Sequence, residues 1–172
     1  LFGLKARICV PEGANPGKVA AMRGLGAEVV FHGSDFDSAR EWIEGVAAEQ
    51  GGRFVGSTEE LLIHGVGTYA LEIMEELPEV EAIIVPVGAG SGACATGIVA
   101  KTINPGIQVI GVQSAQAPAM QMSWASGKAV CADTNTVAEG LATRVPFENT
   151  QRIMRKVLDD FVLVEDDAIE DA

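Results

Sequence analysis

The sequence predicts an α/β fold with doubly wound, mostly parallel sheets. Short apolar runs alternate along the chain with stretches whose apolar residues recur at helical spacing. Several runs have no polar residue in the middle, as in the Ala-Ile-Ile-Val segment of residues 82–85. Such strands are typical of parallel sheets that helices cover on both faces, and the alternation is typical of repeated βαβ units.

The first third of the chain is predicted to form part of a smaller α/β domain. Asn15 is a good helix N-cap and Pro16 suits the first helical position, so a helix is expected to begin there. The pair Gly51-Gly52 is expected to end a second helix. The expected elements, in order, are a strand at residues 7–11, the helix that begins at Pro16 and ends at Gly26, a strand at 28–31, a helix over 36–47 and a short extended run at 53–55.

The remainder is predicted to form part of a larger α/β domain. The expected elements, in order, are a helix that begins near Gly67-Thr68, a strand at 81–87, a helix at 93–103, a strand at 107–112, a helix at 118–125, a helix capped by Asn149-Thr150 and a strand at 161–164. The break near Gly56-Ser57 gives expected domains of residues 1–56 and 57–172. Because the chain starts in mid-pattern, we expect a fragment in which both domains are incomplete.

Composition excludes several classes of function. The 172 residues include 12 basic and 24 acidic side chains, a formal net charge of −12. So acidic a chain is repelled by nucleic acid and by anionic membrane surfaces, and we expect neither as a partner. Three cysteines far apart in sequence, Cys9, Cys94 and Cys131, predict free thiols in the cytoplasm. The acids that crowd residues 159–172 predict a solvated acidic end.

A glycine-rich turn at residues 88–92 carries the main functional signal. An apolar strand precedes it and a predicted helix follows it. Glycines allow backbone N–H groups to approach a ligand closely, and the positive end of the following helix points at the same place. The segment therefore predicts a phosphate-binding site, to which the Ser91 hydroxyl can add a hydrogen bond. The alternative is a plain strand-to-helix turn whose glycines serve packing.

Two common phosphate-binding motifs do not account for this turn. A nucleoside-triphosphate loop requires a lysine after its second glycine, whereas Ile-Val follows Gly97. A dinucleotide fingerprint matches residues 88–93 formally, but no acidic residue lies between Glu81 and Asp133 to hold a ribose hydroxyl. A single phosphate on a smaller cofactor fits better.

The segment Val85–Gly92 resembles the phosphate loop of the fold-type II pyridoxal-phosphate enzymes, whose architecture is tryptophan synthase β-like. It looks most like the threonine/serine dehydratase (threonine ammonia-lyase) branch. The resemblance covers nearly all of the chain, and the other stretches that carry it are, in order, Val10–Lys18, Arg23–Val29, His64–Thr68, Val109–Gln113 and Ala138–Ala142.

This resemblance implies that pyridoxal 5'-phosphate is held through its phosphate by Gly88, Ala89, Gly90, Ser91 and Gly92. It also implies that Gly140 passes close to the pyridine ring. The implied reaction converts threonine or serine to a 2-oxo acid and ammonia. The family's Schiff-base lysine, in a Ser-x-Lys context, and its substrate-carboxylate loop lie upstream, and neither motif is present here. The catalytic residues are therefore unknown, and we expect this chain alone to be inactive.

Other chemically capable residues receive structural interpretations. His32 and His64 are expected in turns or caps, and Cys94 is expected to pack on the inner face of its helix. Glu139 either contacts the cofactor hydroxyl or caps a loop. Lys18 and Lys101 are expected at the surface.

No metal site is expected. Some relatives in the resembled branch carry a divalent cation bound by acids just after the strand that corresponds to residues 109–112. Here those positions are Gln113 and Ala119, which cannot supply carboxylates.

Two alternatives remain open. One is a β-replacement enzyme of the cysteine synthase type, although that branch prefers a Gly-Thr-Gly-Gly-Thr loop. The other is a non-catalytic fragment that binds a phosphate ligand or a partner chain. Because upstream elements of the smaller domain are missing, we expect that domain to expose apolar surface and the chain to associate into a homo-oligomer.

Overall fold

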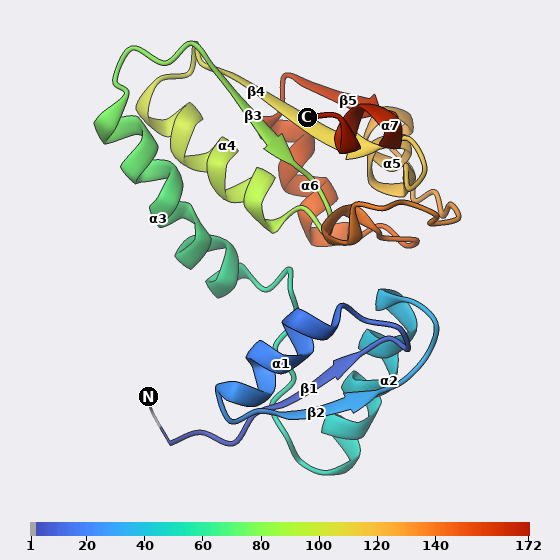
Figure 1. Ribbon diagram of the computed structural model, residues 1–172. Coiled ribbons are helices and arrows are strands. Elements are labelled where there is room, and N and C mark those ends of the chain that lie inside the picture. The colour runs from blue at the N-terminus through green and yellow to red at the C-terminus, as the bar shows by residue number, and fades with distance from the viewer. Residues whose placement is uncertain (1–2) are drawn as a thin grey trace. The chain divides into compact units, whose positions relative to one another are not determined.

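The structure, a computed structural model, describes residues 3–172 and contains two compact units, Leu1–Val55 and Gly56–Ala172 (Figure 1). Both units are built from parallel strands and helices, which confirms the predicted α/β class. No helix in the described part of the chain is long and apolar enough to cross a membrane.

The smaller unit is a two-stranded parallel sheet with two helices packed on it. Its elements are β1 (Arg7–Val10), α1 (Pro16–Gly24), β2 (Glu28–Phe31) and α2 (Phe36–Glu49). The strands pair from Arg7 with Glu28 to Val10 with Phe31. All four elements were predicted, whereas residues 53–55 form no strand.

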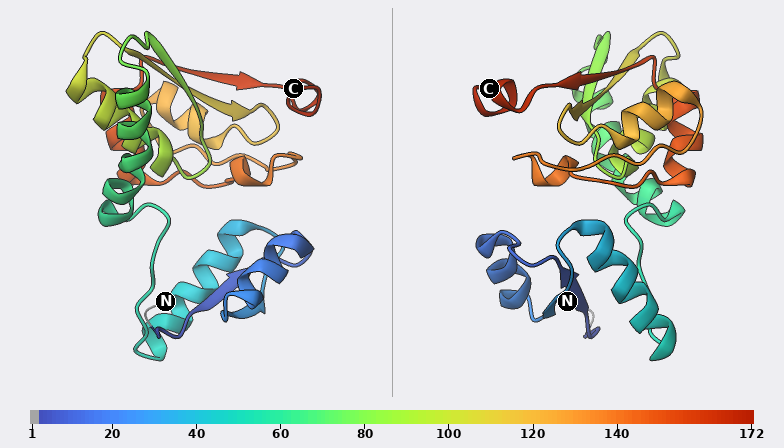
Figure 2. Two further views of the ribbon diagram at one scale, coloured as in Figure 1. Left: turned by 60° about the vertical axis from the view of Figure 1, so that its left-hand side comes forward. Right: turned by 90° about the vertical axis from the view of Figure 1, so that its right-hand side faces the viewer.

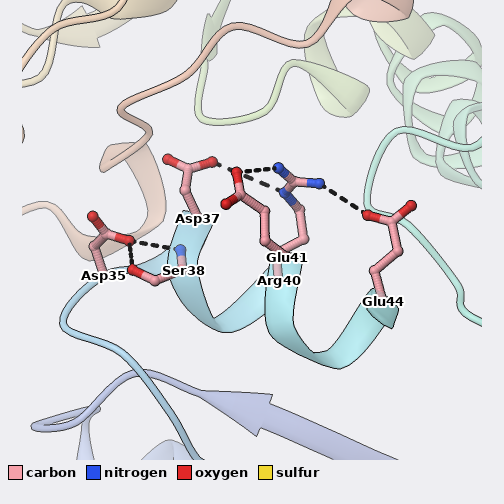
Figure 3. A network of polar contacts seen from close by, with 6 residues as sticks. All are labelled: Asp35, Asp37, Ser38, Arg40, Glu41 and Glu44. Atoms are coloured by element: carbon pink, nitrogen blue, oxygen red, sulfur yellow. Dashed lines mark hydrogen bonds and ion pairs between the residues drawn. The ribbon is translucent and has the colours of Figure 1, made fainter. Parts of the chain in front are cut away.

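Both helices of this unit begin at side-chain caps. The Asn15 side chain accepts hydrogen bonds from the N–H groups of Gly17 and Lys18, at 2.9 and 3.3 Å, which confirms the predicted cap. At α2, the Asp35 carboxylate accepts a hydrogen bond from the Ser38 N–H at 2.7 Å (Figure 3). The same figure shows Arg40 between three carboxylates of α2, those of Asp37, Glu41 and Glu44. These polar contacts define where each helix starts and stabilise α2.

The larger unit is a three-stranded parallel sheet in the order β3-β4-β5. Its elements are α3 (Glu60–Glu76), β3 (Ala82–Pro86), α4 (Ser91–Ile103), β4 (Gln108–Ser114), α5 (Ala119–Ser126), a 3-10 turn η1 (Glu139–Leu141), α6 (Glu148–Val157), β5 (Asp160–Val164) and α7 (Asp166–Glu170). Helices α4, α5 and α6 lie on one face of this sheet (Figure 2). Both crossovers run in the same direction across the sheet, and right-handed crossovers then place their helices on one side.

The core of this unit lies between the sheet and these helices. Val109, Phe161 and Met154 are among the apolar residues that are almost fully buried there. Alternate strand residues point to the opposite face, and Ile84 on that face is 67% exposed. Gly97 and Gly111 allow the close packing of this core, because a Cβ at Gly97 would lie 2.3 Å from Val157.

The predicted starts of α3 and α6 were wrong. Helix α3 begins at Glu60 rather than near Gly67, because Gly67 is an interior position packed against Val99 of α4 rather than a breaker. Helix α6 begins at Glu148, so Asn149 and Thr150 lie inside its first turn and do not cap it. In both cases tertiary packing overrides the local preference of Gly, Asn or Thr.

Candidate functional site

The glycine turn lies at the carboxyl end of β3, where the chain enters α4. The buried Val87 donates its N–H to the Val112 carbonyl at 2.8 Å, so the turn starts from a fixed strand end. Helix α4 begins at Ser91, two residues earlier than expected, with Gly90 as its N-cap at a φ of +94°. That backbone conformation strongly favours glycine.

The backbone N–H groups of this turn are free to bind a ligand. Within residues 3–172, those of Gly88, Ala89 and Gly90 donate to no atom of the protein. The hydrogen bond from the Cys94 N–H to the Gly90 carbonyl, at 2.9 Å, joins the N-cap to the first turn of α4. The N–H groups that precede Cys94 in this turn have no intrahelical acceptor, and the helix dipole makes this end positive. Such an array of donors favours a phosphate or another anion.

The structure brings Gly140 against this turn, although the two are far apart in sequence. A Cβ built on Gly88 would lie 2.2 Å from the Gly140 carbonyl oxygen, so only glycine permits this approach. A Cβ built on Gly140 itself would meet nothing within 4 Å. Gly140 is exposed and lies in the 3-10 turn η1. The η1 backbone therefore forms a second wall beside the turn and leaves open space on the Gly140 side.

Gln113 connects this second wall to the end of β4. Its side chain is fully buried. The Gln113 Nε2 donates to the Leu141 carbonyl at 3.4 Å, and its Oε1 accepts from the Gln121 N–H at 3.1 Å. Gln113 thus links η1 to α5.

Asp166 holds the segment just before η1. Its carboxylate accepts hydrogen bonds from the Ser114 and Thr136 hydroxyls, at 2.5 and 2.8 Å, and from the Val137 N–H at 2.8 Å. The Ser114 hydrogen bond is the main reason why the pKa of Asp166 lies below its ordinary value of 3.8. Asp166 belongs to the predicted acidic end, and its hydrogen bonds give it a structural role that the sequence did not predict.

Thr150 and Met154 of α6 lie directly under the glycine turn. The Thr150 hydroxyl donates to the Ala89 carbonyl at 2.7 Å. A Cβ on Gly90 would lie 3.1 Å from both the Thr150 Cβ and the Met154 Sδ. The turn is therefore seated on α6, which the sequence pattern did not reveal because Thr150 was interpreted as a cap.

Cys94 is a packing residue, as predicted. It is fully buried, its Sγ donates to the Thr150 carbonyl at 3.4 Å, and burial raises its pKa to about 12. His32 lies between β2 and α2 and stacks on Trp42 with 4.7 Å between ring centroids. His64 lies inside α3, 3.9 Å from Glu60, so its assignment to a turn or cap was wrong.

Lys101 is half-buried rather than a surface lysine. Its Nζ donates to the Ile107 carbonyl at 2.6 Å and pairs with the Asp159 carboxylate at 2.7 Å. The Lys101 hydrogen bond also lowers the pKa of Asp159. Lys101 lies near the end of α4 that is remote from the glycine turn. Lys18 is exposed, as expected.

Among residues 3–172, no three His, Cys, Asp or Glu side chains are grouped so that they could hold a metal ion. The site consists instead of backbone donors at the glycine turn and of the facing η1 wall.

Comparison with known proteins assigns this arrangement to a family. The model of the pyridoxal-phosphate dependent enzyme family matches residues 1–172, and the chain belongs to that family. The predicted resemblance is thereby confirmed.

Particular relatives point to one branch of the family. The chain is 37% identical to the L-threonine ammonia-lyase of Thermotoga maritima over 174 aligned residues, which cover 100% of the chain and 43% of that protein. It is 36% identical to the catabolic L-threonine dehydratase TdcB of Escherichia coli, again over 100% of the chain and over 53% of the relative. Among solved structures, maize serine racemase superposes with a TM-score of 0.89 at 31% identity, covering 99% of the chain and 52% of that protein. The chain thus spans about half the length of the relatives it matches.

Proposed function

We propose that this chain forms the phosphate-binding part of a pyridoxal-phosphate-dependent ammonia-lyase that acts on threonine or serine. The observation that carries the proposal is the turn at Gly88–Gly90, which presents free N–H groups at the carboxyl end of a parallel strand and at the start of a helix. In open α/β sheets this end of the strands is where ligands bind. The relatives described above, two of them named for action on threonine, support the branch.

The residues present fit the phosphate of such a cofactor. The free donors of the turn suit a doubly charged anion, and the glycines leave no side chain between these donors and the ligand. The open side of Gly140 offers space for a flat ring beside η1. We therefore propose Gly88, Ala89, Gly90, Ser91 and Gly92 as phosphate ligands and Gly140 as a neighbour of the ring.

When bound, pyridoxal phosphate would supply an electron-withdrawing ring that allows threonine or serine to lose its α-proton and then its β-hydroxyl, and water would hydrolyse the released enamine to a 2-oxo acid and ammonia. The chain's own residues bind and orient. The turn fixes one end of the cofactor, and the η1 backbone limits its lateral movement. The lysine motif that this chemistry requires is absent from these 172 residues, so we propose that the chain is inactive alone.

We also propose a cytoplasmic location and a homo-oligomeric assembly. Free Cys9, Cys94 and Cys131 support a reducing compartment. Exposed apolar side chains on the open face of the three-stranded sheet, Ile84 among them, support association.

Titration with inorganic phosphate tests the binding site. Amide NMR of the 172-residue chain should show its largest shifts at residues 88–93. In Gly90→Val these shifts should disappear, because a branched side chain resists a φ of +94° and collides with Thr150 and Met154. Shifts that fall elsewhere, or undiminished binding by Gly90→Val, would refute the phosphate site.

A product assay tests the activity. It uses a protein that contains these 172 residues together with the upstream segment that carries the Schiff-base lysine. We expect a 2-oxo acid and ammonia from L-threonine or L-serine without a second substrate. Product that forms only when a sulfur nucleophile is added would instead identify a β-replacement enzyme.

A further inference from the structure

We propose that Thr150 is a positioning residue of the phosphate site, which orients the Gly90 N–H toward the anion by holding the Ala89 carbonyl on the opposite side of the same peptide. This inference rests on the proposed function of the glycine turn. It concerns a residue that never contacts the ligand.

The contacts of Thr150 are those of a buried anchor. Its side chain has no exposed surface. Its hydroxyl donates to the Ala89 carbonyl at 2.7 Å and lies farther, at 3.2 Å, from the Phe147 carbonyl. The hydroxyl has a single proton, and the shorter distance identifies the Ala89 carbonyl as its main acceptor. A hydrogen bond in a buried site is costly to lose, so this carbonyl has a fixed direction.

The planarity of the peptide bond transmits this direction to the site. The bond between Ala89 and Gly90 is trans, and in a trans peptide the C=O and N–H groups point in opposite directions. Because the Ala89 carbonyl points at α6, the Gly90 N–H points away from α6. In the described part of the chain this N–H has no protein acceptor, as expected of a donor that is kept for a ligand.

Thr150 also supports the turn sterically. Its Cβ would lie 3.1 Å from a Cβ at Gly90, so the threonine fills the space beneath the turn and leaves no room for it to sink toward α6. The carbonyl cannot rotate freely while the hydroxyl holds it and the Thr150 Cβ lies beneath the turn. The Thr150 side chain therefore fixes both the direction of the Gly90 N–H and the distance of the turn from α6.

The test compares two substitutions that differ in the hydroxyl. Thr150→Val keeps the shape of threonine and removes the donor, whereas Thr150→Ser keeps the donor and removes a methyl group. We expect Thr150→Val to raise the Kd for inorganic phosphate about tenfold, measured by amide shifts of residues 88–93. We expect Thr150→Ser to change it less than about twofold, and the free Gly90 amide resonance to move in Thr150→Val only.

Cys94→Ala is the matched control for a general loss of packing. Cys94 is buried and its Sγ donates to the Thr150 carbonyl, whereas within residues 3–172 its side chain forms no hydrogen bond with Ala89. This variant should lower the melting temperature while the phosphate Kd stays within about twofold of the parent. A Cys94→Ala variant that binds as weakly as Thr150→Val would show that Thr150 acts through packing alone, and would overturn the inference.

The remaining outcomes separate this inference from the proposed function. If the parent chain binds no phosphate at residues 88–93, the proposed function itself fails. If the parent binds and Thr150→Val binds equally well, only the role of Thr150 fails. Should Thr150→Val not fold, Thr150→Ser still decides, because a rise of fivefold or more in its Kd would contradict a role that depends on the hydroxyl.

Discussion

At the scale of single residues, the candidate site depends mainly on backbone N–H groups, several of them at glycines. Gly88 and Gly90 are recognisable from sequence, because glycines between an apolar strand and a helix predict close ligand approach. Thr150 and Asp166 are not, because their roles come from the distant Ala89, Ser114 and Val137 rather than from their own neighbours. A single sequence shows residue types in order but does not show such contacts.

The cysteines should differ sharply in reactivity. Burial raises the pKa of Cys94 to about 12, so at pH 8 it is a protonated thiol without access to reagents. Cys131 is exposed. We expect iodoacetamide to modify Cys131 in the folded chain and Cys94 only after unfolding in urea, as read by peptide mass spectrometry. Rapid labelling of Cys94 in the folded chain would contradict its assignment as a packing residue.

Lys101 should not react with the cofactor aldehyde. Ten residues of helix separate it from Ser91, which corresponds to about 15 Å along the axis. Its amine is bound to Asp159 and to the Ile107 carbonyl. Borohydride reduction after incubation with pyridoxal phosphate should yield no stoichiometric pyridoxyl group at Lys101. The opposite result in the peptide map would require a different arrangement of α4.

At the scale of elements, the sequence predicted which helices and strands exist better than where they start. Strands β1 and β2 and helix α4 follow directly from apolar periodicity and caps. The start of α3 was misplaced because Gly65 and Gly67 resemble breakers, whereas the helix tolerates both. Gly67 is buried against α4, and this packing can be known only once the two helices are paired.

Two glycines of the helices should respond oppositely to alanine. A Cβ at Gly97 would lie 2.3 Å from Val157, so Gly97→Ala must separate α4 from α6 and should cost about 1–3 kcal/mol of unfolding free energy. Gly65 has nothing within 4 Å, so Gly65→Ala should stabilise α3 by roughly 0.4–1 kcal/mol. Urea unfolding of both variants measures the difference. Equal effects would contradict the α4–α6 packing.

Acid should release the segment before η1, Thr136 and Val137, from the Asp166 carboxylate. The pKa of Asp166 is lowered in the folded state, so its stabilising effect is complete above the ordinary value of 3.8 and is lost as the pH falls through the lower folded value. We expect faster hydrogen exchange at the Val137 amide below about pH 4, relative to the Val87 amide, whose acceptor is the Val112 backbone carbonyl. In Asp166→Asn this difference should already be present at neutral pH. An Asp166→Asn chain that still protects Val137 at pH 7 would argue against the anchor.

At the scale of the whole molecule, the chain consists of two α/β units and belongs to the pyridoxal-phosphate dependent enzyme family. The sequence predicted the parallel α/β class and the family, because the order of several short motifs is more specific than any one of them. The expected division into domains 1–56 and 57–172 stays a prediction for the complete domains. The close approach of Gly140 to Gly88 could be recognised only from the structure, since it depends on how residues 134–142 return to the end of β3.

The central claim is that the turn at residues 88–92 holds the phosphate of pyridoxal phosphate while its ring lies beside Gly140. Gly140→Ala tests it most directly, because the added methyl group meets no protein atom within 4 Å and should leave stability unchanged. We predict that Gly140→Ala weakens binding of pyridoxal phosphate at least fivefold, measured by amide NMR titration, and leaves the Kd for inorganic phosphate within twofold of the parent. Equal affinity of the parent and Gly140→Ala for pyridoxal phosphate would contradict the account.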